Sequence, residues 1–369
     1  MAIGLTPARS IAAMQAFRSG GVQRRMIKVP RVRPLMPAVL SVISGVVALV
    51  SGATLAGCGT SRSDDSGSTA TTSSLAASVP APRRTIRLQL AGTGTVPAAV
   101  QLPGLARTTD RRVLAVGGLD AADTSTADVI SVLPAPASRI GQLAQPAHDI
   151  GVTSIGRTVY AFGGGTAAGP IATITAVDRQ GHTRVAGRLP VAMSDTTAVT
   201  LGGTAYVVGG YTTTTPLRSV LSFRPGHGVH VAAELPHPVR YAASAAIGSR
   251  IYVAGGTTGT QARREIVEVD TATHRVRVVG RLPAPLAHAA GVALGGTFYV
   301  LGGRGDALNG QQARIWGFDP VTRELRRAGR LPVALSDLAA VADGDHVVAV
   351  GGRDRQGRVH AERWTFRPR

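Results

Sequence analysis

The chain has 369 residues, of which 44% are hydrophobic but only 4% aromatic, and it carries a formal net charge of +19 and a single cysteine. One thiol excludes an intrachain disulfide framework, so a core of mostly Val, Ala, Leu and Ile must hold the fold together. The basic residues are scattered and not gathered into short runs, which predicts a solvated basic exterior and no specific nucleic-acid binding.

The first 57 residues have the composition of a secretion signal. Residues 1–34 hold seven basic residues and no acidic ones, and residues 35–57 are uncharged and mostly apolar. A positive segment followed by an apolar one is typical of signal peptides. An uncleaved anchor helix is the alternative, because an apolar stretch of this length can span a bilayer. Translation from Met26 or Met36 would shorten the segment to a usual signal length.

The apolar segment ends in the motif Leu55-Ala56-Gly57-Cys58. This motif resembles the bacterial lipobox, in which a peptidase cleaves before the cysteine. The resemblance implies that Cys58 carries diacylglycerol on its thiol and an acyl chain such as palmitate on its amino group. Two acyl chains anchor a protein stably. We therefore expect a lipoprotein on the outer side of the cytoplasmic membrane.

A Ser- and Thr-rich segment follows the cysteine. Residues 58–84 offer few apolar groups that could repay the entropy of ordering a chain. This composition predicts a flexible tether. Residues 85–369 are then the folded domain.

The folded domain contains six repeats, each marked by a Gly-Gly pair at the end of a short apolar run. The spacings between pairs are 46, 46, 46, 47 and 49 residues. The pairs are Gly117-Gly118, Gly163-Gly164, Gly209-Gly210, Gly255-Gly256, Gly302-Gly303 and Gly351-Gly352. Four short strand-like segments per repeat are separated by Gly, Pro and Asp turns, without helical periodicity. We expect an all-β, six-bladed β-propeller with four-stranded blades, in which the glycine pairs are strand-end turns and not phosphate loops.

The repeat resembles that of the kelch family, to which the central domain of galactose oxidase belongs. A kelch tyrosine before the glycine pair is matched at Tyr160, Tyr206, Tyr252 and Tyr299. The aspartate that closes the third strand is matched at Asp178, Asp270 and Asp319. The family's fourth-strand tryptophan is replaced by Val185, Val231, Val278 and Arg327. We therefore expect smaller side chains to pack between the blades.

The ring is expected to close by pairing strands from the two ends of the domain. Residues 363–368 have a third-strand pattern, and no fourth strand follows them. Residues 98–102 are the predicted source of the missing outer strand. Residues 85–90 form a further strand-like segment to which the pattern assigns no place.

Chemically active side chains recur at one position of the repeat. Fifteen and fourteen residues before the first glycine stand His148-Asp149, Ser194-Asp195, Arg240-Tyr241, Ala287-His288 and Ser336-Asp337. In the first repeat Arg107 or Thr108 takes this place. Loops leading into the innermost strands meet the loops after the glycine pairs at a propeller's channel mouth, so these side chains are candidates for ligand binding. Alternatively, the Asp and Ser side chains bond to the backbone in turns, and the others are only solvated.

Two functions of different classes follow from this pattern. The first is a binding module, a lipid-anchored monomer that presents its channel mouth to an envelope protein or a cell-wall glycan. The second is a carbohydrate-active enzyme, because the kelch-like sialic acid mutarotases imply that such a ring can perform acid–base chemistry on a sugar. There the base or acid would be His148, Asp195, His288 or Asp337, and Arg240 would hold an acidic sugar.

We expect neither a cofactor nor a metal. The histidines lack the spacing of metal ligands, and the copper chemistry of galactose oxidase needs a Cys–Tyr crosslink that Cys58 in a lipobox cannot supply. A close cluster of the candidate residues that raises a carboxylate's pKa would favour the enzyme over the binding module. A flat, wide mouth would favour binding.

Overall fold

The structure is a computed structural model that describes residues 87–369. The expected leader, Cys58 and the tether lie outside the described residues. Contacts divide the chain into two units, Met1–Leu75 and Ala76–Arg369, and the described residues all belong to the second. They form β-strands and turns. No helix long and apolar enough to cross a membrane occurs in this part of the chain.

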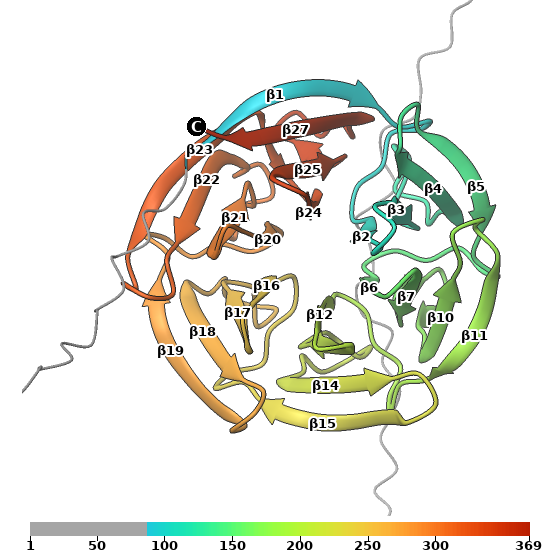
Figure 1. Ribbon diagram of the computed structural model, residues 1–369, viewed down its shortest axis with the longest axis horizontal. Coiled ribbons are helices and arrows are strands. Elements are labelled where there is room, and N and C mark those ends of the chain that lie inside the picture. The colour runs from blue at the N-terminus through green and yellow to red at the C-terminus, as the bar shows by residue number, and fades with distance from the viewer. Residues whose placement is uncertain (1–86) are drawn as a thin grey trace, which may run out of the picture. The chain divides into compact units, whose positions relative to one another are not determined.

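Six antiparallel sheets, five of four strands and one with a short fifth strand, form a six-bladed β-propeller, as the repeats predict (Figure 1). Blade 1 comprises β2 (Gly104–Arg107), β3 (Val113–Val116), β4 (Asp128–Leu133) and β5 (Ser138–Gln142). Blade 2 comprises β6 (Gly151–Ile155), β7 (Thr158–Phe162), β10 (Thr173–Val177) and β11 (Thr183–Arg188). Blade 3 comprises β12 (Thr197–Leu201), β13 (Thr204–Val208), β14 (Ser219–Arg224) and β15 (Gly228–Glu234).

The second half of the ring repeats this order. Blade 4 comprises β16 (Ala243–Ile247), β17 (Arg250–Ala254), β18 (Glu265–Asp270) and β19 (Arg275–Arg281). Blade 5 comprises β20 (Ala290–Leu294), β21 (Thr297–Leu301), β22 (Gln312–Phe318) and β23 (Leu325–Ser336), and β26 (Arg353–Asp354) pairs with the end of β23. Blade 6 comprises β24 (Ala339–Asp343), β25 (His346–Val350), β27 (Glu362–Pro368) and β1 (Leu88–Thr95). A small hairpin, β8 (Gly165–Thr166) and β9 (Gly169–Pro170), extends from blade 2.

Burial explains why the second strand of each repeat is a continuous apolar run. All four residues of β3 and all five of β21 are buried, because neighbouring blades cover both faces of these strands. The outer strand β15 instead mixes exposed and half-buried residues, since it lies at the rim. The apolar runs therefore identify the strands that carry the inter-blade core.

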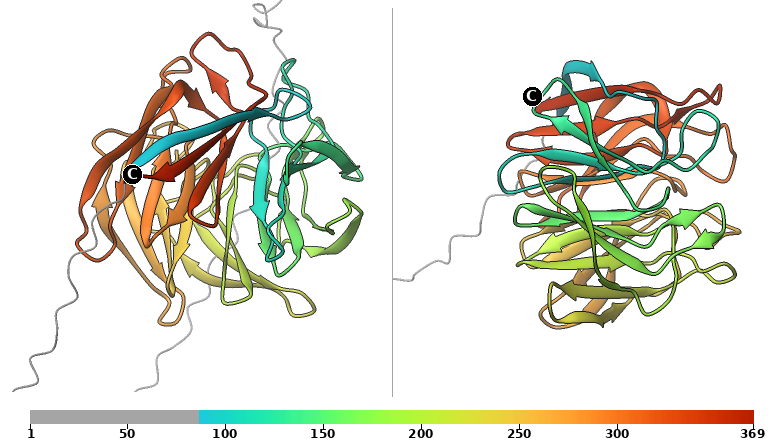
Figure 2. Two further views of the ribbon diagram at one scale, coloured as in Figure 1. Left: turned by 45° about the horizontal axis from the view of Figure 1, so that its top comes forward. Right: turned by 90° about the vertical axis from the view of Figure 1, so that its right-hand side faces the viewer.

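The ring closes with β1 as the outer strand of blade 6. It pairs with β27 in a register from Leu88 opposite Pro368 to Thr95 opposite Glu362, and the two strands lie side by side in both views of Figure 2. Closure by strands from the two ends was expected, but the predicted strand, residues 98–102, was wrong. These residues must carry the chain from the rim to the inner strand β2, so the segment before them supplies the outer strand.

Packing between the blades matches the expectation at three of the six interfaces, where the clusters of buried residues consist of Val, Ala, Leu and Ile. The valines at the family's tryptophan position do not pack between blades, since Val185 and Val231 are 66% and 65% exposed. At the other three interfaces, aromatic side chains of the second and third strands fill the space. Phe223, which is 2% exposed, lies against Tyr160 and Phe162 of the preceding blade, with ring centroids 5.3 and 5.4 Å apart. A chain poor in aromatic residues thus places them where two blades meet.

The glycine pairs are inter-blade turns. Both glycines of every pair have positive φ, 61–66° at the first and 86–115° at the second. The N–H of Gly210 donates to the carbonyl of Val239, 2.8 Å away in the segment that leads into the next blade. A side chain on Gly209 would overlap that same carbonyl oxygen. Each glycine pair therefore forms the same close contact and hydrogen bond with the segment that leads into the next blade, and this contact recurs once per repeat.

Candidate functional site

The two sets of loops expected at the channel mouth do meet there. In each blade a residue before the innermost strand pairs with a residue after the glycine pair. The pairs are Gln101 with Leu119, His148 with Gly165, Ser194 with Tyr211, Arg240 with Thr257, Ala287 with Arg304, and Ser336 with Arg353. One end of the channel is therefore lined by the same two positions of all six repeats.

The residue after each of these pairs belongs to a ring that we call the mouth ring. Its members, one per blade, are Leu102, Asp149, Asp195, Tyr241, His288 and Asp337, with φ between 54° and 62°. In blade 1 the expected candidates were wrong. Arg107 forms an ion pair with Asp343, 2.9 Å away, and Thr108 lies in the turn at the opposite end of β2.

The backbone of the mouth ring is tied together by hydrogen bonds. The N–H of Asp195 donates to Asp149 O (3.0 Å), that of Tyr241 to Asp195 O (3.1 Å), and that of His288 to Tyr241 O (3.0 Å). Asp337 and Leu102 continue the series at 2.9 and 2.7 Å. A left-handed conformation costs a residue other than glycine about 1–3 kcal/mol, and such strain gathers at functional sites. In the mouth ring, the left-handed conformation directs the six side chains toward one cavity of about 690 Å³ that is open to solvent.

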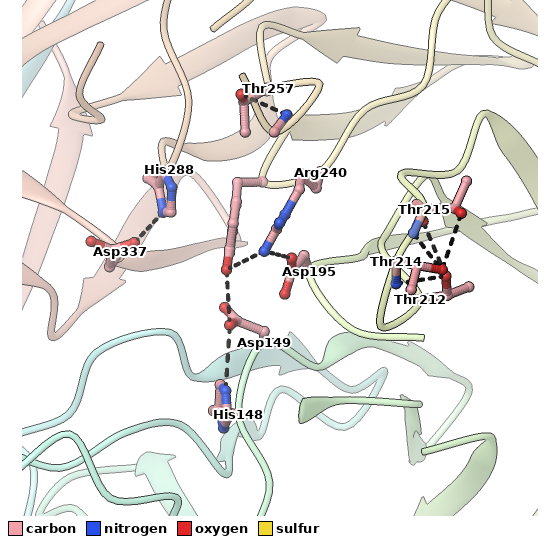
Figure 3. A network of polar contacts seen from close by, with 12 residues as sticks. His148, Asp149, Asp195, Thr212, Thr214, Thr215, Arg240, Thr257, His288 and Asp337 are labelled. Atoms are coloured by element: carbon pink, nitrogen blue, oxygen red, sulfur yellow. Dashed lines mark hydrogen bonds and ion pairs between the residues drawn. The ribbon is translucent and has the colours of Figure 1, made fainter. Parts of the chain in front are cut away.

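Two carboxyl groups of this cavity, those of Asp149 and Asp337, have pKa values shifted in opposite directions; Figure 3 shows both side chains. Burial raises the pKa of Asp149 well above its ordinary value of 3.8, and the nearby carboxylates of Asp195 and Asp337 raise it further. The Tyr241 hydroxyl, 3.3 Å away, offsets only part of this. Burial also pushes the pKa of Asp337 upward, but hydrogen bonds from His288 and Ser336 and the charge of Arg304 outweigh it and lower that pKa.

His288 connects Asp337 to an arginine. Its Nδ1 lies 2.5 Å from Asp337 Oδ1, and its Nε2 lies 2.9 Å from the Arg304 guanidinium. A guanidinium can only donate, so Nε2 accepts and Nδ1 carries the proton that is donated to Asp337. The Ser336 hydroxyl donates to the other Asp337 oxygen at 2.5 Å. Asp337 is therefore held as a carboxylate with a fixed orientation.

Arg240 is held within the site. It forms an ion pair with Asp195 (Figure 3). Its guanidinium lies over the Tyr211 ring, 4.0 Å from the centroid, and donates to the Tyr241 hydroxyl at 3.2 Å. The Tyr241 ring stacks on His288 with centroids 3.8 Å apart. Arg240 thus positions its neighbours, and its pairing with Asp195 counts against the expected role of holding an acidic sugar.

His148 lies at the edge of the cluster. Its Nδ1 is 2.9 Å from the Ser125 hydroxyl, and its Nε2 is 3.7 Å from Asp149 Oδ2. Burial lowers its pKa, and the charge of Asp195 opposes this only in part. A neutral His148 leaves Asp149 without a cation at this contact, in keeping with the raised pKa of that carboxyl group.

Sequence reasoning missed one contributor to the site, Gln311, and did not single out two others, Arg304 and Ser336. Ser336 stands in an aligned pair and Arg304 directly follows a glycine pair, but nothing in the pattern separated them from solvated residues. Gln311 is 2% exposed, donates to the Leu308 carbonyl at 2.9 Å, and has a buried Oε1 without a partner in the described structure. It lines a second solvent-open cavity of about 1030 Å³ that shares Tyr241, His288 and Asp337 with the first.

No group of three or more His, Cys, Asp or Glu side chains within residues 87–369 is arranged to hold a metal ion. The ionisable groups of the mouth ring are instead paired with side chains: Asp337 with His288, and Asp195 with Arg240. What this arrangement supports chemically is proton transfer between the side chains and a ligand in the cavity.

Comparisons with known proteins agree with the fold. No family model matches the chain, and no curated protein matches it by sequence. Solved structures do match, 894 chains in all. One of them, described as "Structure of YjhT", has a TM-score of 0.62 and 14% sequence identity over 74% of this chain and 96% of that chain. This likeness shows the six-bladed propeller and leaves the function to be argued from the site.

Proposed function

We propose that this protein performs acid–base chemistry on a small polyhydroxylated ligand, of the carbohydrate class, at the mouth ring. One observation carries the proposal: Asp149 and Asp337 line the same cavity, and their pKa values are shifted apart. Pairs of titratable groups with this property are typical acid and base partners. The mouth is concave and holds a close cluster with a raised carboxyl pKa, which was the condition that favours the enzyme over a binding module.

The chemistry follows from the two protonation states. A protonated Asp149 can give a proton, and an ionised Asp337 can accept one. Interconversion of sugar anomers needs this combination. The base takes the proton of the C1 hydroxyl, the acid protonates the ring oxygen, and the bond between C1 and the ring oxygen breaks to leave an open-chain carbonyl. Ring closure on the other face returns both protons, so no atom is gained or lost.

Two further parts of the proposal rest on the sequence. The positions of the tyrosines and aspartates in the repeats support a propeller of the kelch type. The motif at Cys58 supports a lipoprotein on the outer side of the cytoplasmic membrane. An enzyme in this place would meet cell-wall glycans and the sugars released from them, and these are the ligands that we propose.

Exchange between anomers, measured by proton NMR on neutral and acidic reducing sugars, tests the proposal. We expect Asp149→Asn and Asp337→Asn each to slow catalysed exchange by about 10²–10⁴-fold. Asp120→Asn is the matched control, because Asp120 binds the backbone of its own exposed loop, with Oδ1 2.8 Å from the Ala122 N–H. Its exchange rate should be that of the wild type.

The pH profile gives a second check on the roles. The rate should rise with pH as Asp337 ionises below 3.8 and fall again as Asp149 loses its proton above that value. A wild-type protein that accelerates no exchange but binds a glycan saturably would be a binding module. Loss of that binding in Asp337→Asn would place it at the mouth ring, and binding that both variants retain would refute any role for the ring.

A further inference from the structure

A cleft lined by arginines lies at the rim, where blade 5 meets the closing strand β1. We call it the seam cleft. Its charged lining consists of Arg87, Arg327, Arg330 and Arg369, all exposed, around about 730 Å³ of space open to solvent. Figure 1 shows the C-terminus beside β1 and β23 at this place. No Asp or Glu side chain of the described residues lines the cleft.

The register of the blades shows that blade 5 departs from the others here. In blade 4 the outer strand places Arg281 opposite Glu265, so that the charges are complementary. The equivalent pair in blade 5 is Arg330 opposite Arg314. Like charges directly opposite each other on a sheet are destabilising. Blade 5 therefore accepts a cost that the other blades avoid at this position.

Among the described residues, none of the arginines of the seam cleft takes part in an ion pair, whereas three of the other blades have such pairs at their outer strands. These pairs are Arg139–Asp128 (2.6 Å), Arg218–Glu234 (2.5 Å) and Arg277–Glu268 (2.7 Å). Where blades 2, 3 and 4 carry an exposed valine, blade 5 carries Arg327. Unpaired guanidinium groups around a concave site suit the oxygens of a phosphate group.

We propose that the seam cleft binds the phosphate headgroups of anionic phospholipids and rests the propeller on the membrane by its rim. The path of the chain favours lipid over a soluble anion, because Arg87 lines the cleft and lies three residues after the end of the predicted tether from Cys58. The predicted tether, residues 58–84, would span about 30 Å as a flexible coil. The lipid anchor would thus keep the cleft close to the surface at a high effective concentration.

This inference goes beyond the proposed function because it concerns the orientation of the protein and not its chemistry. A contact through the rim lays the channel axis along the membrane. The mouth ring, at one end of the channel, then stays open to ligands from the envelope.

Vesicle flotation of residues 76–369, the unit that contains the whole ring and its cores, tests the proposal without the lipid anchor. The vesicles contain phosphatidylcholine with or without phosphatidylglycerol at about 0.1 M salt. An arginine near an anionic surface contributes about fivefold to affinity. We therefore expect Arg327→Gln/Arg330→Gln to bind the anionic vesicles about 30-fold more weakly than the wild type.

The matched control is Arg184→Gln/Arg188→Gln, which removes the same charge from β11. Arg188, opposite Thr173, has in blade 2 the register position of Arg330. This control should bind within about threefold of the wild type. An equal loss in both variants, or a loss in neither, would overturn the proposal. So would an absence of vesicle binding together with cleft-dependent binding of soluble polyphosphate.

Folding and activity give independent readouts. Relief of the repulsion between Arg314 and Arg330 should leave the melting temperature of the cleft variant at or above that of the wild type in low salt. A lower melting temperature would show that the arginines are structural and would overturn the proposal. Anomer exchange should be unchanged in the cleft variant, so failure of this proposal and failure of the proposed enzymatic function can be told apart.

Discussion

Replacing Leu88 with alanine tests how the ring closes. Leu88 is 5% exposed and belongs to the core cluster that also contains Ile315, Leu331 and Phe366 of blades 5 and 6. Truncation removes about three carbon atoms at about 0.8 kcal/mol each, and the cavity left behind adds to this loss. Because Leu88 lies at the first position of β1, partial collapse is easier than in a central strand. We expect a loss of about 2–4 kcal/mol in the free energy of unfolding.

Leu90→Ala is the matched control on the same strand. Leu90 is 46% exposed, so its truncation should cost less than about 1 kcal/mol. Urea unfolding followed by tryptophan fluorescence is a suitable assay, because Trp364 is 3% exposed and lies on β27, opposite Thr93 of β1. The larger loss corresponds to a melting temperature lower by roughly 3–7 °C for a domain of this size.

The comparison of the two leucines decides the outcome. Equal effects of Leu88→Ala and Leu90→Ala, or a loss below about 1 kcal/mol for Leu88→Ala, would mean that β1 is not the strand that closes the ring. The reasoning from burial would then fail along with the assignment.

Three further predictions concern the turns, the site and the anchor. Gly209→Ala should lower the melting temperature of the protein more than Gly248→Ala does. Both glycines have φ of 61°, but only Gly209 faces a carbonyl oxygen that a methyl group would overlap. Equal effects would mean that backbone strain alone is the cause. Asp149 binds protons more tightly when folded, so its contribution to stability is present below pH 3.8 and is lost as pH rises through the raised pKa. Asp149→Asn should therefore be more stable than the wild type at neutral pH and equally stable in acid. Asp337→Asn should be less stable than the wild type at neutral pH, because the pKa of Asp337 is lowered and its carboxylate therefore stabilises the folded state there. Cys58→Ala should abolish labelling by radioactive palmitate and release the protein from membranes, and labelling that persists would refute the lipobox.

The mouth ring combines features that cost stability with features that suit proton transfer. Six left-handed residues are held by the bonds between neighbouring blades, and a carboxyl group with a raised pKa is buried among them. Natural folds tolerate such local conflicts mainly where function requires them. The opposite stability effects predicted for Asp149→Asn and Asp337→Asn are the simplest measure of this conflict.

Much of the fold could be predicted from the sequence because each blade is specified locally. The glycine pairs and apolar runs identify the six repeats, and the alignment of repeats identifies the residues at the channel mouth. All five mouth-ring residues from blades 2 to 6 stand at the aligned positions. The alignment failed in blade 1, where the chain reaches β2 from the rim and Leu102 takes the position assigned to Arg107 or Thr108.

By itself the sequence determined the number of blades, the place of each turn and the candidate residues, because a period in the sequence reports the local register of a repeating unit. Only the tertiary structure decided which strand closes the ring and which side chains become partners. Tyr241 and Asp149 are 92 residues apart in sequence, yet their side chains form a hydrogen bond across the channel mouth. Whether a carboxyl group is protonated depends on such neighbours and on burial, and the repeat pattern contains neither.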